Sequence, residues 1–297
     1  MVRKWVVGAS IAVSLFVLGG CQGKAERGSR GGEGTTSIRV EGSDTMVQLA
    51  QAWAEHYHQI QPSVSIQVLG GGSGVGIASL IDGNCDMANA SREIEPKEIA
   101  RVKANRGEEP KTHVVGHDAL AIFVHKENPL DSISMEELAE IYGDGGKISR
   151  WSQLGVKLQG DDTIVRVSRQ NSSGTYAYFR EAVLGKNRDF KLGSIDQSGS
   201  KDVVALVSRT PNAIGYSGMG YATPEVKMLK VSKKKGEPAV APTIENAKKG
   251  AYPITRALYI YTIGEPKGPV KQYLDWILSP EGQKVVAELG YVPASES

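Results

Sequence analysis

Short apolar runs with strand-like patterning alternate along this 297-residue chain with segments whose apolar residues recur at helical spacing. Two-residue periodicity and compact apolar runs predict strands at 37–41, 64–69, 119–124, 164–168 and 257–262. Apolar residues at three- and four-residue spacing predict helices at 46–57, 77–81, 135–142, 176–184, 270–278 and 281–289. Strands that alternate with helices are typical of an α/β fold, here expected to have largely parallel sheets.

The N-terminal segment has the pattern of an export signal. A basic start, Met1–Lys4, precedes an apolar run that reaches Gly20 and is shorter than the roughly 20 apolar residues of a membrane span. Small residues directly before Cys21 resemble a bacterial lipobox, in which the cysteine is lipidated; an ordinary secretory signal that contains a cysteine is the alternative. Residues 1–21 are predicted to be a lipoprotein signal peptide, and 22–36 a polar, flexible tether. We expect an exported protein anchored by lipid to a membrane surface, in the periplasm or at the cell surface.

The composition excludes several classes of function. The 35 basic and 33 acidic residues nearly cancel, so the chain has no basic footprint for a nucleic acid. Outside the signal, Cys85 is the one remaining cysteine, which excludes an internal disulfide framework. The glycine-rich stretch 70–76 matches neither the phosphate loop of nucleotide hydrolases nor a dinucleotide-binding fingerprint. We expect neither a metal nor a cofactor, and we expect a monomer.

One local design occurs three times: a predicted strand ends, a short loop rich in glycine and hydroxyl residues follows, and a helix begins. The three loops are Gly42–Thr45, Gly70–Gly74 and Arg169–Thr175. The first amides of a helix lack partners within the helix and carry partial positive charge, so they favour a bound anion. Hydroxyl groups add donors, and the arginine that opens the third loop matches the geometry of an oxyanion. Together the loops predict a site for a small oxyanion, with Ser91 and Arg92 as a fourth candidate segment.

At these residues the chain resembles the phosphate-binding proteins of phosphate-specific ABC transporters, over nearly all of 38–293. Motifs outside the loops also carry the resemblance: Glu140–Gly143, Trp151–Gly155, Ala213–Tyr216, Leu278–Gln283 and Leu289–Pro293. The resemblance implies a two-lobed, class II periplasmic-binding-protein-like fold with two hinge crossings that closes on its ligand. It implies high-affinity binding of inorganic phosphate outside the cytoplasmic membrane, delivery to the permease subunits of an ABC importer, and no enzymatic activity.

The resemblance also implies lobe boundaries and ligands. One lobe would comprise 37–117 plus 260–297 and the other 118–259, with crossings near 118–124 and 253–261. The implied phosphate ligands come from both lobes and are Ser43, Thr45, Ser73, Ser91, Arg92, Arg169, Ser173, Gly174 and Thr175. An anion that contacts both lobes favours the closed form through those additional contacts.

The chain departs from the long members of this family at two positions. Those members carry Ser-Asp where this chain has Ser91-Arg92, and an aspartate where this chain has Asn171. The first of these aspartates accepts a proton from monohydrogen phosphate and so rejects sulfate. Asp44 and Asp118 are the two candidates for that role here; a helix cap and a hinge residue are their respective alternatives.

Three other functions stay open from the residues alone, and one is a sensor or adhesion lipoprotein that keeps the fold but binds little. The chemistry of the loops permits another tetrahedral oxyanion, such as sulfate or molybdate. A secreted hydrolase or phosphatase would use Ser73 or Ser173 as its nucleophile, but neither serine stands in a Gly-x-Ser-x-Gly motif.

Overall fold

The computed structural model describes residues 35–294, which belong to one compact unit that begins at Gly34. The predicted signal peptide, Cys21 and most of the predicted tether lie outside these residues. Between residues 35 and 294, no helix has both the length and the apolar character that a membrane crossing needs.

Strands and helices alternate along the described chain, as the sequence predicts. The strands are β1 (Thr36–Gly42), β2 (Val64–Leu69), β3 (Met87–Ala90), β4 (Pro110–His125), β5 (Ser132–Ser134), β6 (Val165–Arg169), β7 (Ile195–Gln197), β8 (Ala213–Gly218), β9 (Val226–Met228), β10 (Lys230–Ser232) and β11 (Thr255–Ile263). The α-helices are α1 (Val47–Ile60), α2 (Ser73–Asp82), α3 (Pro96–Arg106), α4 (Met135–Tyr142), α5 (Gly174–Phe179), α6 (Ser200–Val207), α7 (Ile244–Lys248), α8 (Gly268–Leu278) and α9 (Pro280–Glu288). Shorter helical segments are η1 (Asp44–Met46), η2 (Trp151–Leu154), η3 (Arg180–Leu184) and η4 (Met219–Tyr221).

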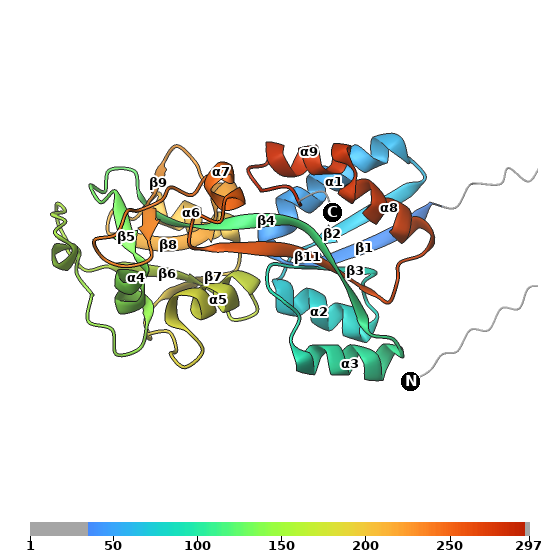
Figure 1. The fold of residues 1–297 in the computed structure, drawn as a ribbon, viewed down its shortest axis with the longest axis horizontal. Coiled ribbons are helices and arrows are strands. Elements are labelled where there is room, and N and C mark those ends of the chain that lie inside the picture. The colour runs from blue at the N-terminus through green and yellow to red at the C-terminus, as the bar shows by residue number, and fades with distance from the viewer. Residues whose placement is uncertain (1–34, 295–297) are drawn as a thin grey trace, which may run out of the picture. The chain divides into compact units, whose positions relative to one another are not determined.

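One long strand links two groups of strands into a single sheet with the order β2-β1-β3-β11-β4-β8-β6-β7, with β9 also paired to β4. Residues 110–119 of β4 pair with β11, and residues 120–124 pair with β8. We call β1–β3 with α1–α3, α8 and α9 the first half, and β6–β9 with α4–α7 the second half. The strands β4 and β11 connect the two halves (Figure 1). The loops that end β1, β2 and β6 are therefore held on a common framework.

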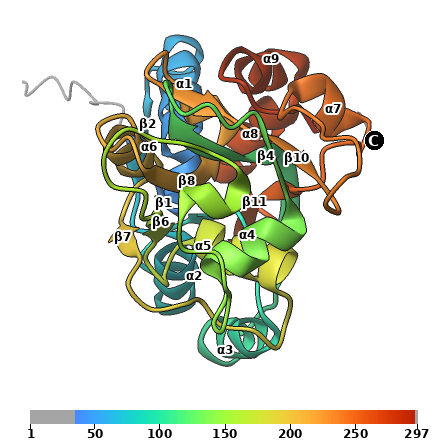
Figure 2. The ribbon, with the colours of Figure 1, turned by 90° about the vertical axis from the view of Figure 1, so that its left-hand side faces the viewer.

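Helices cover both faces of the sheet in the first half. In two views, α1, α8 and α9 lie on one face and α2 and α3 on the other (Figures 1 and 2). Trp53 of α1 is 1% exposed, and its indole Nε1 donates to the carbonyl of Gly282 in α9 at 2.8 Å. A buried indole needs such a partner for its N–H. This contact fixes α1, and with it the preceding loop that carries Asp44 and Thr45.

The α/β class is confirmed, but the expectation of largely parallel sheets needs correction. Pairing is parallel between β1 and its neighbours β2 and β3, and between β6 and its neighbours β7 and β8. The connecting strands β4 and β11 are antiparallel to each other, and they pair antiparallel with β8, β9 and β3 as well. The chain must leave the first half and return to it, so the two connecting strands run in opposite directions.

Most predicted helices match the structure within a few residues. The segment predicted as one helix over 176–184 instead begins at Gly174 as α5 and continues from Arg180 as a π-helical turn, η3. It ends at Gly185, whose φ of +78° suits a residue without Cβ. The earlier start places the helix N-terminus directly at the third glycine- and hydroxyl-rich loop.

Candidate functional site

The three loops identified in the sequence lie at the carboxyl ends of parallel strands, and each leads into a helical segment. Ser43 follows β1 and precedes η1, Gly72 precedes α2, and Ser173 follows β6 and precedes α5. Ser91 follows β3, the next strand of the first half. Carboxyl ends of parallel strands are where α/β folds place their ligands.

Three serine hydroxyls of the first half form a buried cluster. Ser43 Oγ donates to Ser91 Oγ at 3.0 Å, and Ser73 Oγ lies 3.4 Å from Ser91 Oγ. The backbone N–H of Ser91 donates to Ser73 Oγ at 3.0 Å. All three side chains are at most 2% exposed. The segment containing Ser91, which was a separate candidate in the sequence, therefore belongs to the same group of hydroxyls.

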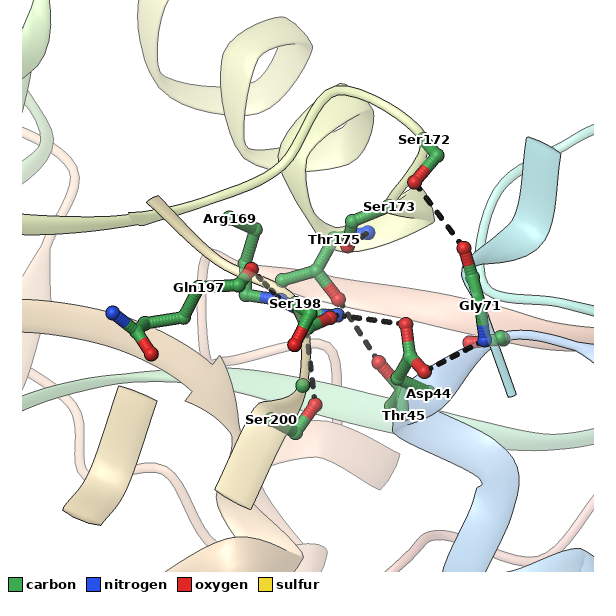
Figure 3. A network of polar contacts seen from close by, with 12 residues as sticks. Asp44, Thr45, Gly71, Arg169, Ser172, Ser173, Thr175, Gln197, Ser198 and Ser200 are labelled. Atoms are coloured by element: carbon green, nitrogen blue, oxygen red, sulfur yellow. Dashed lines mark hydrogen bonds and ion pairs between the residues drawn. The ribbon is translucent and has the colours of Figure 1, made fainter. Parts of the chain in front are cut away.

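The third loop approaches this cluster from the second half. A Cβ at Gly174 would lie 2.3 Å from Ser73 Oγ and 2.6 Å from Ser91 Oγ, which only glycine avoids. The backbone N–H of Gly74 donates to the carbonyl of Ser172 at 3.0 Å. Thr45 Oγ1 and Thr175 Oγ1 are 2.9 Å apart (Figure 3). Loops of the two halves are thus in direct contact.

Arg169 is completely buried at the end of β6. Its Nη2 contacts Asp44 Oδ2 at 3.1 Å and donates to the carbonyl of Ser198 at 2.7 Å, and its Nη1 donates to Ser200 Oγ at 3.1 Å (Figure 3). Burial lowers the pKa of the Arg169 guanidinium, while the nearby Asp44 carboxylate acts in the opposite direction. The ion pair joins the second half to the first.

Asp44 is fully engaged by backbone and side chain. Its Oδ1 accepts from the N–H of Gly71 at 2.9 Å while its Oδ2 contacts Arg169. The hydroxyl of Tyr221 donates to the carbonyls of Asp44 and Thr45 at 2.8 and 2.9 Å. Asp44 therefore connects the first and second loops to each other and both of them to Arg169 of the second half.

Ser173 is a helix cap. Its Oγ accepts from the backbone N–H of Thr175 at 3.1 Å and of Tyr176 at 3.4 Å. These are two of the amides that lack a partner inside α5. The hydroxyl hydrogen of Ser173 remains available, because both recorded contacts use the oxygen as an acceptor.

The guanidinium of Arg92 is directed to a carboxylate of its own half. Its Nη1 and Nη2 contact the two carboxylate oxygens of Glu98 at 2.8 Å each. Burial would lower the pKa of Arg92, but Glu98 raises it overall. Arg92 Nη2 comes within 3.8 Å of the place that a Cβ of Gly74 would occupy. Arg92 thus lies beside the second loop, with its charge paired to Glu98.

A second buried arginine, Arg256, was not among the residues predicted from the sequence. It lies on β11 opposite Asp118 of β4 in the register of the sheet, and its Nη2 is 2.9 Å from Asp118 Oδ2. Arg256 is 5% exposed and Asp118 is fully buried. Burial raises the pKa of the Asp118 carboxyl, and Arg256 partly offsets that rise.

The sequence contained one signal for Arg256. Its side chain is buried, as are those of Leu258 and Ile260 at two-residue spacing along the same strand. Alternate residues of a strand face the same side. A charged residue on the apolar face of a strand needs a buried partner. The alternation therefore indicates that Arg256 is paired inside the protein.

The neighbours of the two candidate nucleophilic serines differ from those of a hydrolase. Ser73 Oγ contacts Ser91, and Ser173 Oγ contacts backbone amides of α5. A serine nucleophile needs a base within hydrogen-bond reach. No histidine occupies that position for either serine in the described part of the chain. Residues 35–294 also contain no group of three or more His, Cys, Asp or Glu that could hold a metal ion.

Comparisons with known proteins agree on one family. Residues 29–281 match the model of the PBP superfamily domain. The chain is 37% identical over 263 residues to the phosphate-binding protein PstS of Pseudomonas aeruginosa, a match that covers 85% of this chain and 81% of that protein. It is 33% identical over 262 residues to the PstS of Bacillus subtilis, with 88% and 81% covered.

Solved structures give the same result. One from Clostridium perfringens, described as a phosphate ABC transporter substrate-binding protein with bound phosphate, has a TM-score of 0.78 and 30% identity. That match covers 88% of this chain and all of the other. An ABC-type phosphate transport receptor from Vibrio cholerae has a TM-score of 0.67 and 26% identity, with 86% and 100% covered. The chain therefore belongs to the PstS-type phosphate-binding proteins of the PBP superfamily.

Proposed function

We propose that this protein binds inorganic phosphate outside the cytoplasmic membrane and delivers it to an ABC importer. Relatives that cover most of the chain are phosphate-binding proteins, and one similar structure holds phosphate. The observation that carries the proposal is the meeting of three anion-type loops from both halves beside the buried guanidinium of Arg169. No enzymatic step is required for this function.

The proposed ligands supply two kinds of donor. The amides at the starts of α2 and α5 offer partly charged N–H groups, and Arg169 offers a full charge. Hydroxyl donors come from both halves and, with the glycine that permits their approach, are Ser43, Thr45, Ser73, Ser91, Ser173, Gly174 and Thr175. Arg92 stays a predicted ligand, although its paired contact with Glu98 gives its charge another partner.

We also propose that the two halves are lobes that close around phosphate, with β4 and β11 as the hinge crossings. The contacts Thr45–Thr175 and Asp44–Arg169 each join one loop of the first half to one of the second. An anion that receives hydrogen bonds from both loops would add to these contacts in the closed form only. Closure is then favoured by the difference in contacts between the two forms.

A carboxylate that accepts the proton of monohydrogen phosphate would reject sulfate, which carries no proton at neutral pH. Asp44 and Asp118 remain the proposed candidates. The contacts favour Asp118, because both oxygens of Asp44 already accept hydrogen bonds. Asp118 Oδ1 is buried and makes no well-aligned hydrogen bond within residues 35–294, although the backbone N–H of Met219 is near enough to act against the raised pKa of this carboxyl.

The anchor and the partners complete the proposal. We propose that Cys21 carries the lipid and that the polar residues after it act as a tether. We also propose that the binding unit is a monomer and that it contacts the permease subunits of the importer at the membrane surface. Tethering would keep the protein close to its importer. Mass spectrometry of the mature protein would check lipidation, since a Cys21→Ser variant should lose the lipid mass and be released from membranes.

Isothermal titration with phosphate, sulfate and molybdate at neutral pH tests the binding function. The protein that begins at Gly34 is suitable, because residues 34–297 form one compact unit. We expect tight binding of phosphate and at least 100-fold weaker binding of sulfate. Equal displacement of phosphate by sulfate would establish a general oxyanion binder instead. Turnover of a chromogenic phosphate ester that is lost in a Ser73→Ala or Ser173→Ala variant would support the hydrolase.

A further inference from the structure

Arg256 occupies a central position among the proposed ligands although it belongs to none of the three loops. It is carried by β11, one of the two strands that connect the halves. Its Nη2 is 3.1 Å from Thr45 Oγ1 and 3.0 Å from Thr175 Oγ1, and its Nη1 donates to the carbonyl of Ser91 at 3.2 Å. Arg256 thus contacts the first loop, the third loop and the serine cluster at once.

The donors of Arg256 exceed the fixed acceptors that surround it. A guanidinium has five N–H groups and no acceptor. Asp118 Oδ2 takes hydrogen bonds from Nε and Nη2, at 3.2 and 2.9 Å. The carbonyl of Ser91 is the one acceptor that Nη1 contacts among residues 35–294. One N–H of Nη1 is therefore left for another acceptor in a buried place, where an unmade hydrogen bond is costly.

The threonine hydroxyls next to Arg256 are also oriented by it. Each lies within hydrogen-bond distance of Nη2, whose two N–H groups are shared among these oxygens and Asp118 Oδ2, and the two threonine oxygens are 2.9 Å apart. One hydrogen lies between the two oxygens, so the other hydroxyl has a hydrogen to donate elsewhere. An acceptor-only group with several lone pairs, such as an oxyanion, would satisfy both this hydroxyl and the remaining guanidinium N–H.

The charges near Arg256 fit the same ligand class. Arg169 and Arg256 are close enough for the second charge to lower the pKa of the first. Each has one aspartate partner, Asp44 and Asp118 respectively. Two like charges that are brought together in a buried region repel each other, and an anion between or beside them relieves that repulsion. Arg92 does not belong to this group, because Glu98 takes both of its terminal nitrogens.

We infer that Arg256 is the second cationic ligand of the bound oxyanion. Asp118 holds its guanidinium in place through Oδ2, which leaves Oδ1 for the proposed role as proton acceptor. This inference rests on the proposed function. It assigns the second charge of the site to a connecting strand rather than to a loop. Thr45 and Thr175 come from opposite halves. An anion bound at Arg256 would therefore contact both halves, so that binding of its charge would also favour the closed form.

The experiment uses isothermal titration to compare the phosphate affinity of three variants of the Arg256–Asp118 pair and one surface control. Arg256→Gln combined with Asp118→Asn removes the charge without leaving a buried carboxylate unpaired, so this variant should keep its fold. We expect its phosphate affinity to fall at least 100-fold. Arg256→Lys keeps the charge but loses the planar fork, and an intermediate loss of about 10-fold is expected. Asp118→Asn alone should also weaken binding, by less than the double change.

The matched control is Arg101→Gln on the exposed surface of α3, which should bind phosphate like the parent protein. A direct readout comes from the guanidinium ¹⁵N–¹H resonances, assigned to Arg256 by their loss in Arg256→Lys. These resonances should shift when inorganic phosphate is added, which a purely structural brace between strands would not produce. Thermal unfolding of each variant checks that it is folded.

The outcomes separate the two proposals. If the parent protein binds phosphate but the double variant binds it equally well, and the Arg256 resonances do not move, then Arg256 is only a structural brace and the inference is wrong. If the parent protein itself does not bind phosphate, the proposed function fails, and the inference that depends on it fails too.

Discussion

Two arginine–aspartate pairs lie at the centre of this molecule, and they differ in the way the chain holds them. Arg169 and Asp44 belong to loops of opposite halves, 125 residues apart, and Asp44 keeps a side-chain exposure of 15%. Arg256 and Asp118 are cross-strand neighbours on β11 and β4, with side-chain exposures of 2% and 0%. The first pair crosses between the halves, whereas the second is fixed within the framework that connects them.

This difference separates two tasks that a closing site must perform. A contact between loops can form and break as the halves approach and separate. A contact between paired strands should persist in both of the proposed open and closed states, because the strand register holds it. We therefore expect loss of the loop pair to affect closure and affinity, and loss of the strand pair to affect stability as well.

The largest effect is expected for the stability of Arg256→Gln. Removing one partner of a fully buried ion pair leaves an uncompensated charge and typically costs about 3–5 kcal/mol. Arg169→Gln should lower the free energy of unfolding by less, about 1–3 kcal/mol, because Asp44 retains contact with water. Urea unfolding at pH 7 measures both values. Equal losses in the two variants would remove the distinction between the pairs.

The next effect concerns phosphate affinity. Arg169→Gln should weaken phosphate binding about 100-fold, or about 2.7 kcal/mol, because a charge-assisted contact in a buried site is lost. Titration calorimetry measures the change, and Arg101→Gln again serves as the exposed control. An unchanged affinity in Arg169→Gln would contradict a role of Arg169 as a phosphate ligand.

A smaller effect should follow at the Thr175 hydroxyl, which contacts both Thr45 and Arg256. Thr175→Val keeps the shape of the side chain but removes the contacts to Thr45 and Arg256. One lost hydrogen bond of this kind corresponds to about 1 kcal/mol, or roughly a five- to tenfold weaker affinity for phosphate. Thr175→Ser, which retains the hydroxyl, should stay within about twofold of the parent protein in the same titration. Equal binding by the two variants would contradict a role for the hydroxyl.

The smallest effects are expected at the third arginine–carboxylate pair, Arg92–Glu98, which contributes to stability in a pH-dependent way. The pKa of Glu98 lies below its usual 4.5, because hydrogen bonds from Arg92 and the backbone outweigh the effect of burial. A lowered carboxyl pKa stabilises the fold above the unfolded-state pKa, and this contribution is lost as pH falls through the folded-state pKa. Glu98→Gln should therefore be about 1–2 kcal/mol less stable than the parent at pH 7. That difference should shrink as the pH falls below about 4.5 and through the lowered pKa of Glu98 in the folded protein.

The same pair also tests the predicted role of Arg92. Arg92→Gln should change phosphate affinity less than about threefold if Glu98 holds its charge. A loss as large as that of Arg169→Gln would support Arg92 as a phosphate ligand and weaken the case for Arg256. Calorimetry on the two variants side by side decides between these outcomes.

Local patterns in the sequence predicted much of the fold. Helices such as α4 are specified by apolar spacing and a capping box, in which Ser134 and Glu137 bond each other's backbone amides. The two connecting strands were predicted in part, at 119–124 and 257–262. Their antiparallel direction was not predicted, because strand direction depends on where the chain returns and not on local periodicity. The predicted lobe boundaries depend on the same long-range path.

The site shows the same division between local and long-range information. The three loops were found because glycine and hydroxyl residues at helix starts have a local signature. Arg256 was missed because its partners Asp118 and Thr45 are 138 and 211 residues away in sequence. Arg92 stays a predicted ligand, but its contact with Glu98 could not be predicted, because it depends on where the first turn of α3 lies relative to residue 92.

The number of residues in the long strand β4 fixes the alignment of the two halves. Residues 110–119 of this sixteen-residue strand pair with β11, with one register shift at Leu258/Tyr259, and residues 120–124 pair with β8. Successive side chains of a strand point to opposite faces. Deleting a single residue near Asp118 would therefore move every later side chain of β4 to the opposite face of the sheet. It would also shift the second half by one residue of strand register relative to the first. Insertions and deletions accumulating among descendants of this chain should spare this strand and fall in its surface loops.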